Sequence, residues 1–162
     1  MLRYFFSLVV LFSCSSIAVG QSGLQSSSAA GYMALTSHEV NMRVGPGTEY
    51  PVTWVYQRRH LPFEVVDEVD AGWVHLRAHD GEEGWITRDL LTTRRTFRVQ
   101  SYHTEVHRRP EEGSRIMAYL SEGVVGELRT CQGDWCQISL ADTRGWVKRE
   151  NLWGVGRNEN FE

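Results

Sequence analysis

The chain contains an internal repeat, and this feature constrains its fold more than any other. Landmarks of the first half recur in the second: Pro46 and Pro110, Trp73 and Trp135, Gly84-Trp85 and Gly145-Trp146, and Leu91 and Leu152. Their offsets of 64, 62, 61 and 61 residues change only between landmarks, as expected when insertions fall in loops. Each unit has roughly 50 to 60 residues, which is near the lower size limit for independent folding. The repeat therefore predicts two small domains in tandem.

Within a unit, apolar and polar residues alternate with the period of a half-buried β-strand. Residues 40–44 (Val-Asn-Met-Arg-Val) show this pattern, and so do residues 73–77, where Val74 and Leu76 are expected inward and Trp73 outward or at the edge. Residues 61–66 and 124–128 are further strand candidates, and glycine-rich segments, including Thr143-Arg144-Gly145, are expected to form turns. There is no long helical period. The pattern predicts an all-β protein built from two small barrels or sandwiches.

The N-terminal segment has the form of a secretory signal peptide. Arg3 precedes an apolar run from Tyr4 to Phe12, and Ala18-Val19-Gly20 has the small-x-small form that precedes cleavage after Gly20. The run is too short for a stable membrane span. A lipoprotein signal acylated on Cys14 is a minor alternative. The expected order is a signal peptide (1–20), a flexible leader (21–35), domain 1 (36–95), domain 2 (96–155) and a polar tail (156–162), with a periplasmic or secreted location.

Two cysteines, Cys131 and Cys136, remain after the signal segment. An even number of cysteines in an exported chain favours a disulfide. The Gly133-Asp134 turn between them predicts a hairpin that brings the two sulfurs together. The four-residue gap does not fit the Cys-x-x-Cys spacing of redox or zinc motifs. We therefore expect a structural disulfide, shielded by the neighbouring Trp135.

Composition and motifs argue against several functions. The formal net charge is -3, so the broad positive field that nucleic acids require is missing. The pairs His103/His107 and His75/His79 have i, i+4 spacing, but the His-Glu-x-x-His order of metalloproteases is absent and both pairs lie in predicted strands or loops. Acidic clusters before the turns are typical of solvated loops. We predict no enzyme activity, no cofactor and no metal.

A family resemblance is carried by Asn41-Met42-Arg43-Val44-Gly45-Pro46-Gly47 and by the closing Gly84-Trp85-Ile86 and Leu90-Leu91. These residues resemble the opening and closing motifs of bacterial SH3-like domains. Residues 52–62 look like the exported subgroup of Gram-negative bacteria, and residues 133–155 are similar to its second repeat. In the second unit, Arg109-Pro110-Glu111 replaces Gly-Pro-Gly. The resemblance implies two SH3-like barrels in the cell envelope and no reaction, because relatives use such domains to hold peptidoglycan peptides.

The first unit carries the candidate ligand site. Tyr50, Trp54, Tyr56 and Trp73 are predicted to form an aromatic groove, because aromatic side chains offer rigid contact area to peptides and sugars. Trp85, Trp135, Trp146 and Trp153 are expected to pack. The predicted function is a non-catalytic envelope-binding module whose partner is a peptidoglycan peptide or an envelope protein. The alternative is a protein-interaction or assembly scaffold with no small ligand. The sequence assigns no oligomeric state.

Overall fold

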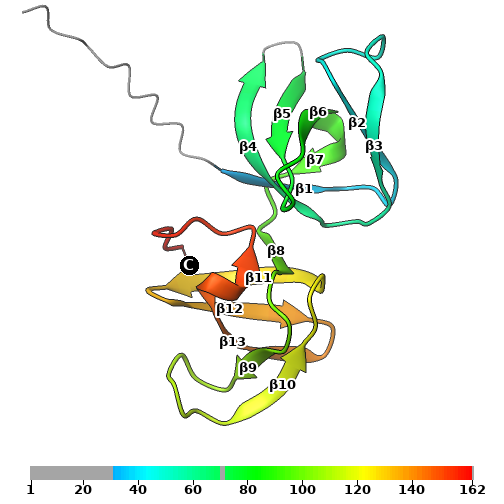
Figure 1. The fold of residues 1–162 in the computed structure, drawn as a ribbon. Coiled ribbons are helices and arrows are strands. Elements are labelled where there is room, and N and C mark those ends of the chain that lie inside the picture. Colours follow the sequence, from blue (N-terminus) through cyan, green and yellow to red (C-terminus); the bar gives the residue numbers. More distant parts are fainter. Residues whose placement is uncertain (1–30, 70–71, 162) are drawn as a thin grey trace, which may run out of the picture.

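A computed structural model describes residues 31–69 and 72–161, and in these ranges the protein is two β-barrels joined by a short linker (Figure 1). The strands of the first barrel are β1 (Tyr32–Leu35), β2 (Val40–Arg43), β3 (Val52–Tyr56), β4 (Pro62–Val69), β5 (Trp73–Arg77), β6 (Glu83–Thr87) and β7 (Leu91–Thr92), with a 3-10 turn η1 (Arg88–Leu90) before β7. Those of the second are β8 (Thr96–Val99), β9 (Thr104–His107), β10 (Ile116–Leu120), β11 (Val125–Gln132), β12 (Trp135–Leu140), β13 (Thr143–Lys148) and β14 (Leu152–Trp153), with η2 (Arg149–Asn151) before β14.

The two barrels have the same topology, which confirms the all-β prediction and the tandem repeat. Hydrogen bonds order the first sheet as β3-β2-β6-β5-β4-β1-β7 and the second as β10-β9-β13-β12-β11-β8-β14. Each strand of the second barrel thus occupies the place of the strand seven positions earlier. β3 and β10 are the edge strands at the equivalent end of each sheet.

Period-two alternation places the core residues as the sequence predicts. On β5, Val74 and Leu76 are buried, whereas Trp73 lies on the opposite face and is only partly buried.

The two barrels fill the same part of the core with a phenylalanine from different strands. Met33 on β1 pairs with Phe63 on β4 in the first barrel, whereas Phe97 pairs with Gly126 in the second. A Cβ atom on Gly126 would lie 2.7 Å from the Phe97 ring, so the glycine provides the space for that ring.

The predicted turn at Thr143-Arg144-Gly145 is wrong, because these residues begin β13. The chain reverses just before them, where Ala141 has a φ of 44°. Gly145 is buried in the strand, and a Cβ atom there would overlap the Val106 side chain of β9. The glycine serves the close approach of two strands. Gly84 does the same in the first barrel, where a Cβ atom would lie 2.5 Å from Met42 Cγ.

Both ends of the described chain are more ordered than the sequence predicts. Residues 32–35, expected in the flexible leader, form β1, which pairs with β4 and β7. A four-residue strand has too short a pattern to be distinguished from a linker, because its partners lie far away in the sequence. The polar tail also folds back, and Phe161 forms an isolated β-bridge with Cys131. The predicted signal peptide, its cleavage site and Cys14 lie outside the described residues.

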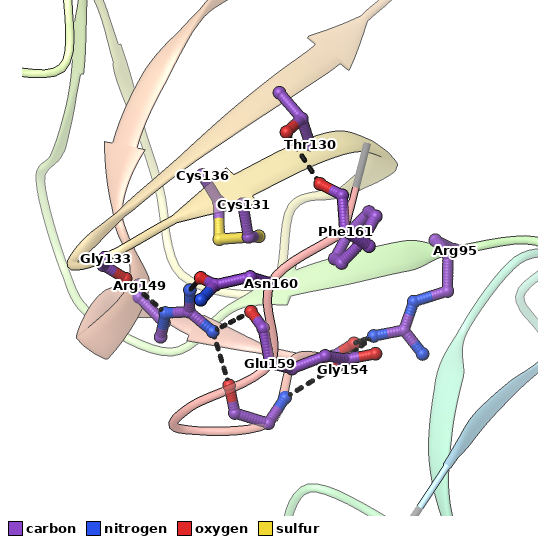
Figure 2. The surroundings of a disulfide bond; sticks show 11 residues. Arg95, Thr130, Cys131, Gly133, Cys136, Arg149, Gly154, Glu159, Asn160 and Phe161 are labelled. Atoms are coloured by element: carbon purple, nitrogen blue, oxygen red, sulfur yellow. Dashed lines mark hydrogen bonds and ion pairs between the residues drawn. A yellow bond between two sulfur atoms is a disulfide. The ribbon is translucent and has the colours of Figure 1, made fainter.

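The predicted disulfide between Cys131 and Cys136 is present, and both cysteines are fully buried (Figure 2). They face each other on β11 and β12 with a Cα–Cα distance of 4.1 Å. Phe161 belongs to the same hydrophobic cluster. Trp135, expected to shield the bridge, is the strand neighbour of Cys136 and so points to the opposite face. There it contacts His107 and Lys148 instead.

The barrels contact each other through β14 of the second barrel and strands β1 and β4 of the first. Trp153 Nε1 donates a hydrogen bond to Pro62 O at 3.2 Å, and the Trp153 ring meets the Tyr32 ring edge-on at 5.6 Å. Arg95 in the linker lies against the rings of Tyr32 and Phe161 and pairs with Glu159. We call this set of contacts the junction.

Among the described residues, no helix is long and apolar enough to cross a membrane.

Reduction of the disulfide is expected to lower the free energy of unfolding by about 2 kcal/mol, because it frees a short hairpin loop in the unfolded chain. The measurement is urea unfolding of the oxidised protein and of the protein kept in dithiothreitol. A Cys131→Ser/Cys136→Ser variant serves as the control and should not respond to dithiothreitol. Equal stability of the oxidised and reduced proteins would contradict the prediction.

The junction hydrogen bond can be tested with Trp153→Phe, which keeps a ring against Tyr32 and removes the donor to Pro62 O. We expect a loss of about 1 kcal/mol in unfolding free energy, the usual net value of one such bond. Trp54→Phe is the matched control, because Trp54 is 48% exposed on the edge strand β3. The prediction fails if both variants lose the same amount.

Acidification is expected to weaken the fold through His79. Burial first, and Arg98 of the second barrel next, lower the pKa of His79 below its ordinary value of 6.5. The unfolded chain takes up a proton near pH 6.5 and the folded chain resists it, so the stabilisation is present above that pH and lost below it. Urea unfolding at several pH values should show a weaker pH dependence for His79→Gln, and an unchanged dependence would refute this.

Candidate functional site

A group of exposed apolar side chains lies on the first barrel, and we call it the first-barrel aromatic surface. It is defined by five residues that are 40–53% exposed: Val44, Tyr50, Val52, Trp54 and Val55. All five come from the β2–β3 loop and from β3, the edge strand of the sheet. An edge strand has a neighbour on one side only, so its side chains are covered less than those of inner strands.

The Gly-Pro-Gly motif shapes the loop that carries Tyr50. The Tyr50 ring lies directly over Gly45, where a Cβ atom would come within 2.5 Å of ring atom Cδ1. Arg43 donates from Nη1 to Tyr50 O at 2.6 Å and so ties the loop to β2. The motif that carries the family resemblance thus holds an exposed tyrosine ring in place.

The structure does not bring all four predicted site residues together. Tyr50 and Trp54 belong to the first-barrel aromatic surface. Tyr56 packs into the core edge-on against Phe63, with ring centroids 4.9 Å apart. Its buried hydroxyl has no hydrogen-bond partner in the described part of the chain, and burial raises the pKa of Tyr56 to about 12. Trp73 lies on β5, which is separated from β3 by β2 and β6.

An equivalent surface on the second barrel was missed from the sequence. We define the second-barrel aromatic surface by Tyr102, Met117 and Tyr119, which are 76%, 52% and 61% exposed. The His103 ring stacks on Tyr102 with centroids 4.4 Å apart. The repeat offset aligns β10 with the edge strand β3 and so could have indicated that Met117 and Tyr119 are exposed, whereas Tyr102 lies before β9 and has no such signal.

The four histidines with i, i+4 spacing have other roles in the structure. His107 is buried, with Nδ1 at 3.2 Å from Ser114 O and Nε2 at 3.0 Å from Glu105 Oε2. His75 stacks on Trp85 with centroids 4.7 Å apart. Within residues 31–69 and 72–161, no group of three or more His, Cys, Asp or Glu side chains is placed to hold a metal ion.

A pocket of about 780 Å³ lies at the junction. We call it the junction pocket. The first barrel contributes Tyr32 and Glu64, and the second contributes the remaining wall: Gln100, Asp134, Lys148, Arg149, Glu150, Leu152, Trp153, Val155, Gly156 and Arg157. None of the four predicted ligand residues is part of it. The sequence could not reveal this pocket, because its walls come from segments up to 125 residues apart.

The electrostatics of the junction pocket are mixed. Burial first, and the carboxylates of Glu64 and Glu159 next, raise the pKa of Tyr32 to about 12, so its hydroxyl stays protonated at neutral pH. A hydrogen bond with Glu112, followed by the charges of Glu112, Glu150 and Asp134, raises the pKa of Lys148. A second pocket, of about 510 Å³, lies between the barrels beside Arg58, Arg59 and Leu140.

Comparison with known proteins gives one curated relative and several solved structures. The chain is 23% identical over 165 residues to the Bacillus subtilis (strain 168) protein named "Putative N-acetylmuramoyl-L-alanine amidase YrvJ". The match covers 95% of this chain and 31% of the relative, so the chain spans about a third of that protein.

Three solved structures are similar at low identity. NlpC1 of Trichomonas vaginalis is 16% identical, with a TM-score of 0.36 over 85% of this chain and 50% of its own. NlpC2 of the same organism is 14% identical, with a TM-score of 0.35 over 76% and 48%. An NlpC/P60 family protein of Bacillus cereus ATCC 10987 is 13% identical, with a TM-score of 0.36 over 76% and 56%.

Family comparison matches two segments of the chain, residues 36–92 and 103–154. They correspond to the two barrels and cover more than half of the sequence. The chain therefore belongs to the bacterial SH3 domain family, of which it carries two tandem copies.

Proposed function

We propose that the protein is a non-catalytic binding module of the cell envelope that recognises peptidoglycan peptide through the first-barrel aromatic surface. The observation that carries this proposal is the exposure of Tyr50 and Trp54, at 40% and 48%, on a loop and edge strand of a bacterial SH3 domain. Large apolar side chains gathered on the surface of a small domain are typical of interaction sites. The Gly45 contact fixes the Tyr50 ring, so little side-chain entropy is lost on binding.

Membership of the family and the named amidase activity of the relative support a role at the cell wall. The Cys131–Cys136 disulfide supports an oxidising compartment, such as the periplasm or the outside of the cell. The proposed domain boundaries, 36–95 and 96–155, contain the matched segments, although β1 places the start of the first barrel slightly earlier.

Several contacts support a binding role over a catalytic one. Both ring nitrogens of His107 are engaged by groups of its own barrel, and His75 is stacked on Trp85 next to Glu83. The Ser114 hydroxyl beside His107 accepts a hydrogen bond from Arg109 N, and the two cysteines of the described residues are joined in the disulfide. A nucleophile with a positioned base is therefore not assembled by these residues.

A scaffold role is the second candidate, and the junction favours it. Trp153, Tyr32 and Arg95 hold the barrels against each other, so the two aromatic surfaces have a fixed separation. Two barrels held in this way suit a protein partner that contacts both aromatic surfaces at once.

The first experiment is retention of the protein on purified peptidoglycan sacculi. We expect Tyr50→Ala/Trp54→Ala to weaken binding at least about tenfold, because truncation of central aromatic anchors costs more than about 1 kcal/mol each. The matched control is Tyr102→Ala/Tyr119→Ala, which removes two exposed aromatic rings from the second barrel. Circular dichroism checks that each variant is folded.

Loss of binding in the first variant and its retention in the second would support the proposal. Equal loss in both variants would favour the scaffold reading, in which both surfaces contribute. A wild-type protein that does not bind sacculi would overturn the proposal and direct the search to envelope proteins.

A further inference from the structure

We propose that the junction pocket is a second binding site, distinct from the first-barrel aromatic surface, and that it takes a short peptide carrying both ammonium and carboxylate groups. The location and the ligand chemistry follow from the pocket itself. The expectation that such a peptide comes from peptidoglycan rests on the proposed function.

The pocket has the size and position of a small-ligand site. Its volume of about 780 Å³ lies within the range of roughly 300–1,000 Å³ that is common for such sites, and domain interfaces are a preferred location. Both barrels contribute to its wall, through Tyr32 and Glu64 on one side and Trp153 on the other. A ligand here would therefore contact two domains at once.

The wall of the pocket is fixed before any ligand binds. Arg149 is only 8% exposed and donates to Gly133 O at 2.9 Å and to Gly156 O and Glu159 O at 2.6 Å each (Figure 2). One guanidinium thus ties the tip of the disulfide hairpin to the C-terminal tail. A fixed wall lowers the entropic cost of binding.

The two barrels also approach each other closely at Gly154, next to Trp153 of the pocket wall. Gly154 has a φ of 106°, and a Cβ atom there would overlap Thr96 O and lie 3.0 Å from Pro62 Cβ. A larger residue would overlap Thr96 O of its own barrel and crowd Pro62 of the first barrel. The close approach and the Trp153–Pro62 hydrogen bond hold the two sides of the pocket at one separation.

Part of the pocket wall is aromatic and apolar. Tyr32 and Trp153 stand edge to face, with Leu152 and Val155 from the same stretch of the second barrel. The Tyr32 hydroxyl makes no hydrogen bond to any described residue, and its raised pKa keeps it protonated. It can donate to a ligand oxygen.

The charges of the pocket are balanced in sign, and some are available to a ligand. Lys148 pairs with Glu112, and Glu64 pairs with Arg77, so these two are already engaged. In contrast, Asp134, Glu150 and Arg157 are exposed and form no side-chain ion pair within residues 31–69 and 72–161. The available groups are therefore two carboxylates and one guanidinium.

This set of groups selects the class of ligand. Asp134 and Glu150 can each accept hydrogen bonds from an ammonium group, and Arg157 can bind a carboxylate in a two-point contact. A polyanion would be repelled by the carboxylates of Glu64, Asp134 and Glu150. In a short peptide with free amino and carboxyl groups, the amino group can pair with the pocket carboxylates and the carboxyl group with the guanidinium. The apolar part of the peptide can contact Tyr32 and Trp153.

The probe is the tripeptide L-alanyl-γ-D-glutamyl-L-lysine with free ends, compared with the same tripeptide acetylated on its amino groups and amidated on its carboxyl groups. Binding of each form of the tripeptide to the protein is measured by isothermal titration calorimetry. Nitrogen-15 NMR adds a local readout, because the indole N–H signal of Trp153 should shift when the pocket fills. The free tripeptide should bind at least about tenfold more tightly than the blocked form.

The variant Glu150→Gln/Arg157→Gln removes one available charge of each sign, and both side chains are exposed, so the fold should be retained. We expect it to weaken tripeptide binding at least about tenfold and to abolish the Trp153 shift. Glu39→Gln/Arg115→Gln is the matched control, because both residues are exposed and lie outside the pocket wall. It should bind as the wild type does.

Three results would overturn the inference: no tripeptide binding by the wild type, equal binding of the blocked form, or unchanged binding by Glu150→Gln/Arg157→Gln. Equal binding of the blocked form would point to an uncharged ligand held by the aromatic wall. Sacculus retention keeps the two proposals separate. Loss of retention only in Tyr50→Ala/Trp54→Ala speaks to the proposed function, whereas loss of tripeptide binding only in the pocket variant speaks to the junction pocket.

Discussion

The contact of Trp153 with Pro62 and Tyr32 joins the two barrels, and the architecture around the junction depends on it. Each barrel buries its own hydrophobic cluster, and Val125 of the second barrel also packs against the cluster of the first. What the junction adds is a fixed relative position. The hydrogen bond from the indole and the space left by Gly154 bring β14 directly against β4. A pocket with walls from two domains can be specific only if the two domains keep a fixed relative position.

The C-terminal tail and the disulfide act on the same junction. Phe161 pairs with Cys131, Glu159 pairs with Arg95 of the linker, and Arg149 donates to carbonyl oxygens of the tail (Figure 2). The hairpin closed by the disulfide is therefore connected through the tail to the segment that joins the barrels. The second barrel therefore stabilises the junction through its hairpin and tail, and it also carries an exposed aromatic surface of its own.

The two repeats keep one topology and differ in how they use it. The exchange of Met33 and Phe63 for Phe97 and Gly126 shows that one core volume can be filled from either of two paired strands. At the surface, Tyr50 and Trp54 of the first barrel have no aromatic counterpart at Ser114 and Ala118, where the repeat aligns them, and Tyr102 and Tyr119 appear instead. Conserved packing thus allows the exposed residues of each copy to specialise.

The sequence by itself determined the fold class, the repeat, the inward residues of β5 and the disulfide, because period-two alternation, repeated landmarks and cysteine spacing are local signals. It misplaced Gly145, since a glycine required by a neighbouring strand looks like a turn glycine. It grouped Tyr56 with Trp54, since alternation puts both on one face and cannot tell that only Tyr56 reaches Phe63. Only the tertiary structure decided where the junction and its pocket lie, because Tyr32, Glu64, Glu150 and Arg157 become neighbours through barrel packing and leave no periodic trace in the chain.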